Sequence, residues 1–289
     1  MRLLQKSLWL TLIGIVVFTS FFLARILVSD YLAANVLNPS GSKDDFINAQ
    51  EIARENSDVK LMTGEAKDSN NKKISWWFFS NSKAENDLLV VYVYGIAGID
   101  PPVLKQLTSK YNVFVTSAPG FNGSDDVANE VTYAETAGNA FQILASNSLF
   151  ESFSKKILYS HSMGNYPAAL YVKDHNVFLH VMAQPPDTAN DVCKRTNPWY
   201  EKLLCSYADL KFNTSQYIAE TKSPTCVIST DTDTLVPKES GDLVFSALPG
   251  DIPKYRILTQ ASKPLDMNGG HNNFPVIETL EQCISELRL

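Results

Sequence analysis

The sequence predicts an α/β fold with a mostly parallel sheet and helices on both of its faces. Short apolar runs, typical of strands buried on both sides, alternate along the chain with helix-compatible stretches. One run leads into Ser160-His161-Ser162-Met163-Gly164, which resembles a sharp strand-to-helix turn that presents a serine. Further polar motifs follow other strands, at the sheet edge where ligand sites of such folds gather.

The expected elements begin with a helix at 44–56 and a hairpin whose strands span 60–66 and 73–80. Trp76 to Phe79 make the second strand fully apolar, so we expect it to be buried on both faces. The remaining expected elements are strand 88–94, helix 102–110, strand 112–117, helix 133–146, strand 156–160, helix 166–172, strands 177–183, 225–229 and 255–259, and helix 274–287.

Ser162 is the candidate nucleophile. Small residues two positions before and two after it, Ser160 and Gly164, let the flanking backbones pass closely and lift the hydroxyl clear of the turn. The hydroxyl then lies at the N-terminus of the following helix, whose dipole favours a developing anion. A surface serine in an ordinary turn is the alternative interpretation.

A serine hydroxyl needs a base, and the chain has four histidines. His161 adjoins Ser162 but is expected to point away from it. His175 and His180 belong to the region of strand 177–183 and are expected at the surface or at an edge. Only His271 follows the last strand and precedes the last helix, within Asn268-Gly269-Gly270-His271, and it is the candidate base.

The acid that orients this base is expected just after strand 225–229, where two aspartates compete. Asp233 precedes Leu-Val-Pro at the expected spacing and is preferred. Asp231 is the alternative acid, although its carboxylate is also suited to holding the loop through an Asx-turn.

An oxyanion intermediate needs two backbone N–H donors. Met163 follows the nucleophile and supplies the first. Strand 88–94 opens into Gly95-Ile96-Ala97-Gly98, where the N–H of Ile96 is the second candidate.

Taken together, these motifs resemble those of the α/β-hydrolase superfamily, in particular its lipase/esterase and serine-aminopeptidase-like branch. The elbow at 160–164, the oxyanion loop at 94–98, the Pro-Gly loop at 118–125, the acid loop at 233–237 and the histidine loop at 269–271 occur in the family's order. The resemblance implies an eight-stranded-type sheet with a short cap insertion over the site. Ser160, Tyr94 and Ala118 depart from the family pattern, which indicates a divergent member.

The chain of 289 residues is expected to have three parts. Residues 1–34 are a cytoplasmic stub with a signal-anchor or transmembrane segment, and 35–58 are a linker with an amphipathic helix. Residues 59–289 are the hydrolase domain, with a cap insertion at about 185–221. The aromatic and leucine side chains of the cap either line an acyl pocket or pack the cap on the body.

The first part is predicted from an uncharged apolar run at 7–24, with Arg2 and Lys6 before it. Positive charge on that side predicts a cytoplasmic N-terminus and a catalytic domain on the extracytoplasmic side of a membrane. Cleavage near Ala33-Ala34 is the alternative, and it predicts a secreted protein.

Four cysteines fit an exported domain, because an even count permits two disulfides. Pairing Cys193 with Cys205 closes a short loop in the cap, and pairing Cys226 with Cys283 ties a core strand to the last helix. Three connectivities are possible, and four buried thiols are the alternative.

A net charge of −6 gives no basic surface for nucleic acid, and no motif indicates a cofactor or a metal. We therefore expect a serine hydrolase that cleaves lipid-like or small acyl esters, with the membrane as its other partner. A serine peptidase of the aminopeptidase-like kind is the alternative enzyme. A non-catalytic binding domain on the same fold is the alternative from another class.

Overall fold

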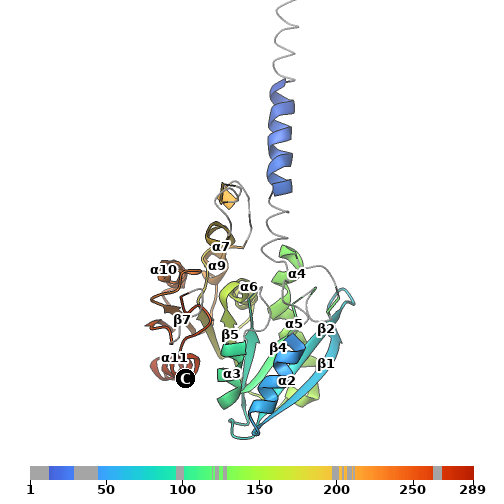
Figure 1. The fold of residues 1–289 in the computed structure, drawn as a ribbon, viewed down its shortest axis with the longest axis vertical. Helices are drawn as coiled ribbons and strands as arrows, with labels where there is room; N and C mark the ends of the chain where they lie inside the picture. Colours follow the sequence, from blue (N-terminus) through green and yellow to red (C-terminus); the bar gives the residue numbers. More distant parts are fainter. Residues whose placement is uncertain are drawn as a thin grey trace, which may run out of the picture.

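A computed structural model describes residues 13–28, 45–95, 101–118, 120, 124–125, 129–196, 202–203, 205–206, 210, 212–262 and 269–289. Its centre is an eight-stranded sheet with the order β1-β2-β4-β3-β5-β6-β7-β8 (Figure 1). The strands are β1 Val59–Lys67, β2 Lys73–Asn81, β3 Leu88–Val93, β4 Asn112–Thr116, β5 Lys155–His161, β6 Leu179–Ala183, β7 Thr225–Thr230 and β8 Lys254–Thr259.

The sheet is antiparallel only at one side, where β1 pairs with β2 and β2 pairs with β4. All other neighbours, from β4 through β3, β5, β6 and β7 to β8, run parallel. Their carboxyl ends therefore lie at one edge, and loops that are far apart in sequence meet there. The predicted α/β fold with a mostly parallel sheet is confirmed.

Helices cover both faces of the sheet. The longer ones are α2 Asp45–Glu55, α3 Pro101–Lys110, α5 Thr136–Ser146, α6 Asn165–Asp174, α10 Lys238–Ala247 and α11 Val276–Glu286. Apolar side chains of α2, α3 and α11 form one buried cluster with the sheet, and those of α5, α6 and α10 form a second one. The strands supply both clusters because successive side chains point to opposite faces: Val90 and Tyr92 belong to the first, and Leu89 and Val91 to the second.

The apolar strand β2 follows the same rule. Trp77 and Phe79 point to the first cluster, and Trp76 and Phe78 point to the second. None of the four is more than 9% exposed, so the predicted burial on both faces is confirmed. The expected helix 133–146 is instead two helices, α4 Glu130–Ala134 and α5, which meet at Glu135.

The segment 185–221, expected as the cap, contains α7 Ala189–Thr196 and α9 Thr214–Ile218, and a bridge pairs Thr188 with Asn213. Within it, Leu210 and Phe212 are buried against the body, as one of the two interpretations of the cap predicts. Leu203 is 69% exposed. The cap's other candidate lining residues, Trp199, Tyr200, Leu204 and Tyr207, lie outside the described residues.

The structure has one of the three disulfide connectivities that the sequence leaves open, and the alternative of four buried thiols is wrong. Cys193 on α7 is bonded to Cys205, and Cys226 on β7 is bonded to Cys283 on α11. The second bond links a central strand to the last helix, 57 residues further along the chain.

Residues 13–28 form a helix that projects from the rest of the molecule, drawn in dark blue in Figure 1. Its apolar side chains are exposed, Phe18 at 72% and Leu27 at 68%. In the part of the chain that the structure describes, no helix combines the length and the apolar content needed to cross a membrane. The expected segment 1–34 also includes residues outside the described ranges, and its spanning role stays a prediction.

Candidate active site

Ser162 lies at the turn between β5 and α6, as the sequence predicts. Its backbone has a φ of 53°, in the left-handed region that non-glycine residues seldom adopt, at a cost of about 1–3 kcal/mol. Gly164 makes this turn possible, since a Cβ there would lie 2.3 Å from the carbonyl oxygen of Val93 on β3. The elbow therefore packs closely against the neighbouring strand. Ser162 itself is partly exposed, whereas Met163 and Gly164 are buried.

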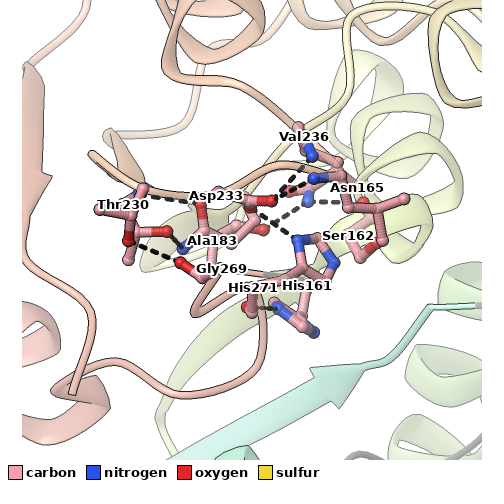
Figure 2. Close-up of polar contacts among 12 residues, drawn as sticks. His161, Ser162, Asn165, Ala183, Thr230, Asp233, Val236, Gly269 and His271 are labelled. Atoms are coloured by element: carbon pink, nitrogen blue, oxygen red, sulfur yellow. Dashed lines mark hydrogen bonds and ion pairs between the residues drawn. The ribbon is translucent and has the colours of Figure 1, made fainter. Parts of the chain in front are cut away.

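The structure brings His271 and Asp233 together. Nδ1 of His271 lies 2.7 Å from Oδ2 of Asp233, and both side chains are buried. Figure 2 shows the His271 ring lying between the Asp233 carboxylate and Ser162. Asp231 is exposed and does not take this place. The three side chains come from the ends of β5 and β7 and from the loop that follows β8, which the parallel sheet places at one edge.

Backbone donors fix the Asp233 carboxylate. Its Oδ1 accepts hydrogen bonds from the N–H groups of Leu235 and Val236, each at 2.8 Å. These bonds fix the orientation of the carboxylate and leave Oδ2 for the histidine. The Asp-x-Leu-Val spacing read from the sequence is thus the spacing that lets the loop close onto its own aspartate.

Two glycines shape the loop that carries His271. Gly269 has a φ of 71° and Gly270 a φ of 96°. A Cβ at Gly269 would lie 2.1 Å from the carbonyl oxygen of Thr232, and one at Gly270 would lie 2.1 Å from Cβ of Ala261. The Thr232 hydroxyl donates to the carbonyl oxygen of Gly269 at 2.6 Å, so the acid loop and the histidine loop are joined directly.

His161 contacts the backbone of the candidate base, His271. Its Nε2 lies 3.1 Å from the carbonyl oxygen of His271, and the two ring centroids are 5.0 Å apart. The side chain points away from Ser162, as expected, and toward the histidine loop. No sequence motif indicates this contact, because it joins residues 110 positions apart.

His180 corrects a prediction. It was expected at the surface or at an edge, but it is fully buried in β6, a central strand. Burial lowers the pKa of His180 to about 3, so its imidazole is neutral at physiological pH. Its Nε2 lies 3.0 Å from Oγ of Ser160. His175 is exposed beyond the end of α6, as expected.

Gln184 is a second residue that sequence reasoning missed. It follows β6 with a φ of 49° and is fully buried. Its amide donates to the Thr230 hydroxyl and accepts from the Thr230 N–H, both at 3.0 Å. This paired contact holds the end of β7, from which the acid loop starts.

The oxyanion donors are described only in part. Met163 is buried beside Ser162 and carries the first predicted N–H. Ile96 lies outside the described residues. Gly95, just before it, is close to the nucleophile, since a Cβ there would lie 3.2 Å from Cβ of Ser162. The first residues after β3 thus lie directly beside the elbow.

Two of the three departures from the family pattern contact each other. The Tyr94 hydroxyl accepts a hydrogen bond from the N–H of Ala118 at 3.2 Å. The Tyr133 hydroxyl donates to the carbonyl oxygen of Tyr94 at 3.1 Å. Tyr94 therefore links the end of β3 to the start of the Pro-Gly loop through its hydroxyl, a group that His at the same position lacks.

Within the described part of the chain, no three His, Cys, Asp or Glu side chains are grouped as a metal site would require. The chemistry that the described side chains offer is that of a serine hydroxyl, a histidine and a buried carboxylate. Such a set supports nucleophilic acyl transfer.

Comparisons with known proteins agree on the fold. No family model matches the chain, and no curated protein matches it by sequence. Among solved structures, an esterase from Pyrococcus furiosus superposes with a TM-score of 0.59 at 18% identity, over 73% of this chain and 84% of the other. The esterase domain of a Rhodothermus marinus protein gives 0.55 at 13% identity, over 79% and 99% of the two chains. A bacterial membrane phospholipase A gives 0.54 at 15% identity, over 98% and 99%.

These likenesses, with the strand order and the elbow, define the class: the chain has the α/β-hydrolase fold. At this level of identity the fold is what the chain and these structures share.

Proposed function

We propose that the protein is a serine hydrolase that cleaves carboxylic esters through an acyl-enzyme. One observation carries the proposal: a buried aspartate–histidine pair lies beside a serine held at a positive φ on a strand-to-helix elbow (Figure 2). A strained serine conformation and a buried carboxylate both cost stability, and folds retain such features mainly where chemistry uses them.

In the proposed reaction, the Ser162 hydroxyl attacks the ester carbonyl while His271 takes its proton. Asp233 orients the imidazole and stabilises its positive charge. The N–H groups of Met163 and Ile96 stabilise the tetrahedral oxyanion. His271 then protonates the leaving alcohol, and the C–O bond of the ester breaks. Water, deprotonated by His271, attacks the acyl-enzyme and releases the acid, with the proton returned to Ser162.

The surroundings of the serine favour an apolar acyl group. Met163, Tyr166 and Phe212 belong to one buried apolar cluster formed between the elbow and the cap. Tyr166 and Phe212 are in edge contact, with ring centroids 4.4 Å apart. An apolar cluster this close to the candidate nucleophile supports an ester with a hydrocarbon acyl group over a charged peptide.

A lipid ester presented by a membrane is the substrate class that we propose. Val28, the last described residue of the projecting helix, packs against the same apolar cluster. Outside that helix, Val131 on α4 and Leu203 in the cap are the most exposed large apolar side chains among the described residues, at 71% and 69%. Figure 1 shows α4 at the end of the molecule from which the helix projects. One solved structure of similar fold is described as a membrane phospholipase A.

We also propose that residues 1–34 anchor the domain on the extracytoplasmic side of a membrane. Arg2 and Lys6 before the apolar run, and two disulfides in the domain, support this placement. Membrane fractions of cells that produce the full chain should retain the protein after carbonate extraction. Release into the soluble fraction, with the intact mass of a chain that begins after Ala34, would instead establish a cleaved segment and a secreted enzyme.

Hydrolysis tests the function directly. The purified full chain should release acid from p-nitrophenyl esters and from phosphatidylcholine vesicles, and Ser162→Ala should abolish both activities. Ser285→Ala, which removes an exposed hydroxyl from α11, is the matched control and should keep wild-type turnover. Preferred cleavage of aminoacyl amides would move the assignment to a peptidase. Absence of turnover in folded wild type, on esters and amides alike, would leave a non-catalytic binding domain.

A further inference from the structure

Asn165, the first residue of α6, contacts the elbow through its side chain. Its Nδ2 donates to the carbonyl oxygen of Ser162 at 2.8 Å and to that of Ala183, at the end of β6, at 2.9 Å. The residue is completely buried. Its backbone N–H also donates to the Ser162 carbonyl. The carbonyl of the candidate nucleophile therefore receives a side-chain bond in addition to the usual one from a helical turn.

This bond matters because the Ser162 carbonyl and the Met163 N–H belong to the same peptide unit. A peptide is planar, so fixing the direction of its C=O fixes the direction of its N–H. A hydrogen bond accepted by the C=O also polarises the amide and strengthens the N–H as a donor. Asn165 is thus connected through one rigid group to the N–H that faces the oxyanion.

The Asn165 amide is itself held. Its Oδ1 accepts from the Ser160 hydroxyl at 2.7 Å. Because that hydroxyl gives its proton to Asn165, its oxygen accepts from Nε2–H of His180 at 3.0 Å. Ser160 Oγ also lies 3.2 Å from the carbonyl oxygen of Val181. Nδ1 of His180 has no hydrogen-bond partner among the described residues, which agrees with a neutral ring protonated at Nε2.

We propose that Asn165 is a positioning residue of the oxyanion hole, locked in orientation by Ser160 and His180. The inference rests on the proposed hydrolase function and adds a residue to that site. It also explains the third departure from the family pattern, because a glycine at position 160 has no hydroxyl to hold the amide.

Alanine at position 165 removes both side-chain donors and keeps the backbone bond to Ser162. We expect Asn165→Ala to lower kcat by about 10- to 100-fold, less than the loss of a whole oxyanion donor, with little change in KM. The affinity for an aryl trifluoromethyl ketone, whose adduct with Ser162 carries an oxyanion, should fall by a similar factor. Ser160→Ala should give a smaller loss of the same kind, because it frees the amide without removing it.

Asn139→Ala, which truncates a buried asparagine on α5 outside this network, is the control and should leave kcat unchanged. Thermal unfolding of each variant shows whether a loss of kcat comes from a destabilised fold or from lost positioning of the oxyanion donor. Unchanged kcat in folded Asn165→Ala, or a loss of kcat without weaker ketone binding, would overturn the positioning role while the hydrolase assignment stands.

A spectroscopic measurement addresses the geometry without turnover. In protein labelled with 15N-methionine, the Met163 amide is identified by its absence in Met163→Leu. Its 15N resonance should shift upfield in Asn165→Ala as the preceding carbonyl loses its bond, and an unmoved resonance would contradict the contact. If Asn165→Ala shows the shift but folded wild type neither hydrolyses esters nor binds the ketone, the hydrolase function is overturned, and the positioning role of Asn165 with it.

Discussion

At the scale of single residues, the described site depends on a few side chains that each do one task. Asp233 combines two backbone donors on one oxygen with the imidazole on the other. Asp231, two residues earlier, is exposed. The sequence named both, because spacing alone cannot say which carboxylate turns inward. The direction of each side chain depends on how the loop closes, and that follows from contacts with the distant Gly269.

This difference predicts unequal effects of two matched substitutions. Asp233→Asn should lower kcat by about 10³- to 10⁴-fold. The substitution removes the carboxylate that stabilises the imidazolium, and the new amide favours the wrong tautomer of the histidine. Asp231→Asn should leave turnover close to the wild-type value. Ester hydrolysis by both purified variants is the measurement, and a larger loss at Asp231 would move the acid to that residue.

His180 shows what a sequence pattern hides. Its neighbours Leu179 and Val181 to Ala183 form an apolar run, which is the one signal that this histidine lies inside a buried strand. Its partner Ser160 lies on the adjacent strand, and the β5–β6 register that brings them together has no local signature. The prediction therefore placed the strand correctly and the side chain wrongly.

The depressed pKa of His180 predicts an acid-sensitive fold. The unfolded chain binds a proton at this residue below about pH 6.5, whereas the folded protein binds it only near pH 3. This contribution to stability is therefore complete above pH 6.5 and is lost progressively as the pH falls toward 3, with a slope of up to about 1.4 kcal/mol per pH unit. Unfolding midpoints in denaturant between pH 7.5 and 5 measure it.

His180→Gln removes the titration and is the matched variant. Its stability should fall less steeply between pH 6.5 and 5 than that of the wild type, even if it is lower at every pH. Equal slopes for the two proteins would show that His180 is not buried in its neutral form.

At the scale of elements, apolar periodicity was sufficient for the strands and most helices. Strand β3 and the Trp76–Phe79 strand are apolar without interruption, and both are buried on two faces. The pattern failed around α4, where the capping box of Asn129 starts the helix three residues before the expected position and the helix ends at Glu135. The cap was predicted as an insertion without a defined structure, since its packing depends on contacts with the body.

The two disulfides are predicted to differ in their effect on stability. The Cys226–Cys283 bond closes a span of 57 residues between a core strand and the last helix, and the Cys193–Cys205 bond closes one of 12 within the cap. Replacing both members of the first pair by alanine should lower the free energy of unfolding by about 2–4 kcal/mol. The same change in the second pair should cost less, because the shorter loop restricts the unfolded chain less.

Guanidinium unfolding of the two double variants under non-reducing conditions compares these losses. Ser285→Ala, which leaves both disulfides in place and removes only an exposed hydroxyl, serves as the reference. A greater loss from the cap pair would mean that the cap, and not the sheet, limits the stability of the domain.

At the scale of the whole molecule, the parallel sheet explains why the site exists. Parallel strands place their carboxyl ends at one edge, so Ser162, Asp233 and His271 meet although they are spread over more than a hundred residues. The apolar cluster beneath the cap and the projecting helix 13–28 lie toward the same end. The order of the motifs along the chain predicted this arrangement, because the topology of a parallel sheet brings the ends of its strands together. The Asn165 network was not predicted, because it depends on distances that only the folded structure supplies.

The central claim is that Ser162 is an activated nucleophile, and a fluorophosphonate probe tests it most directly. The account predicts that the purified wild type gains one covalent adduct, located at Ser162 by peptide mass spectrometry. Ser162→Ala and His271→Ala should remain unlabelled, while Ser285→Ala labels as the wild type does. A folded wild type that forms no adduct, or an adduct that persists in Ser162→Ala, would contradict the account.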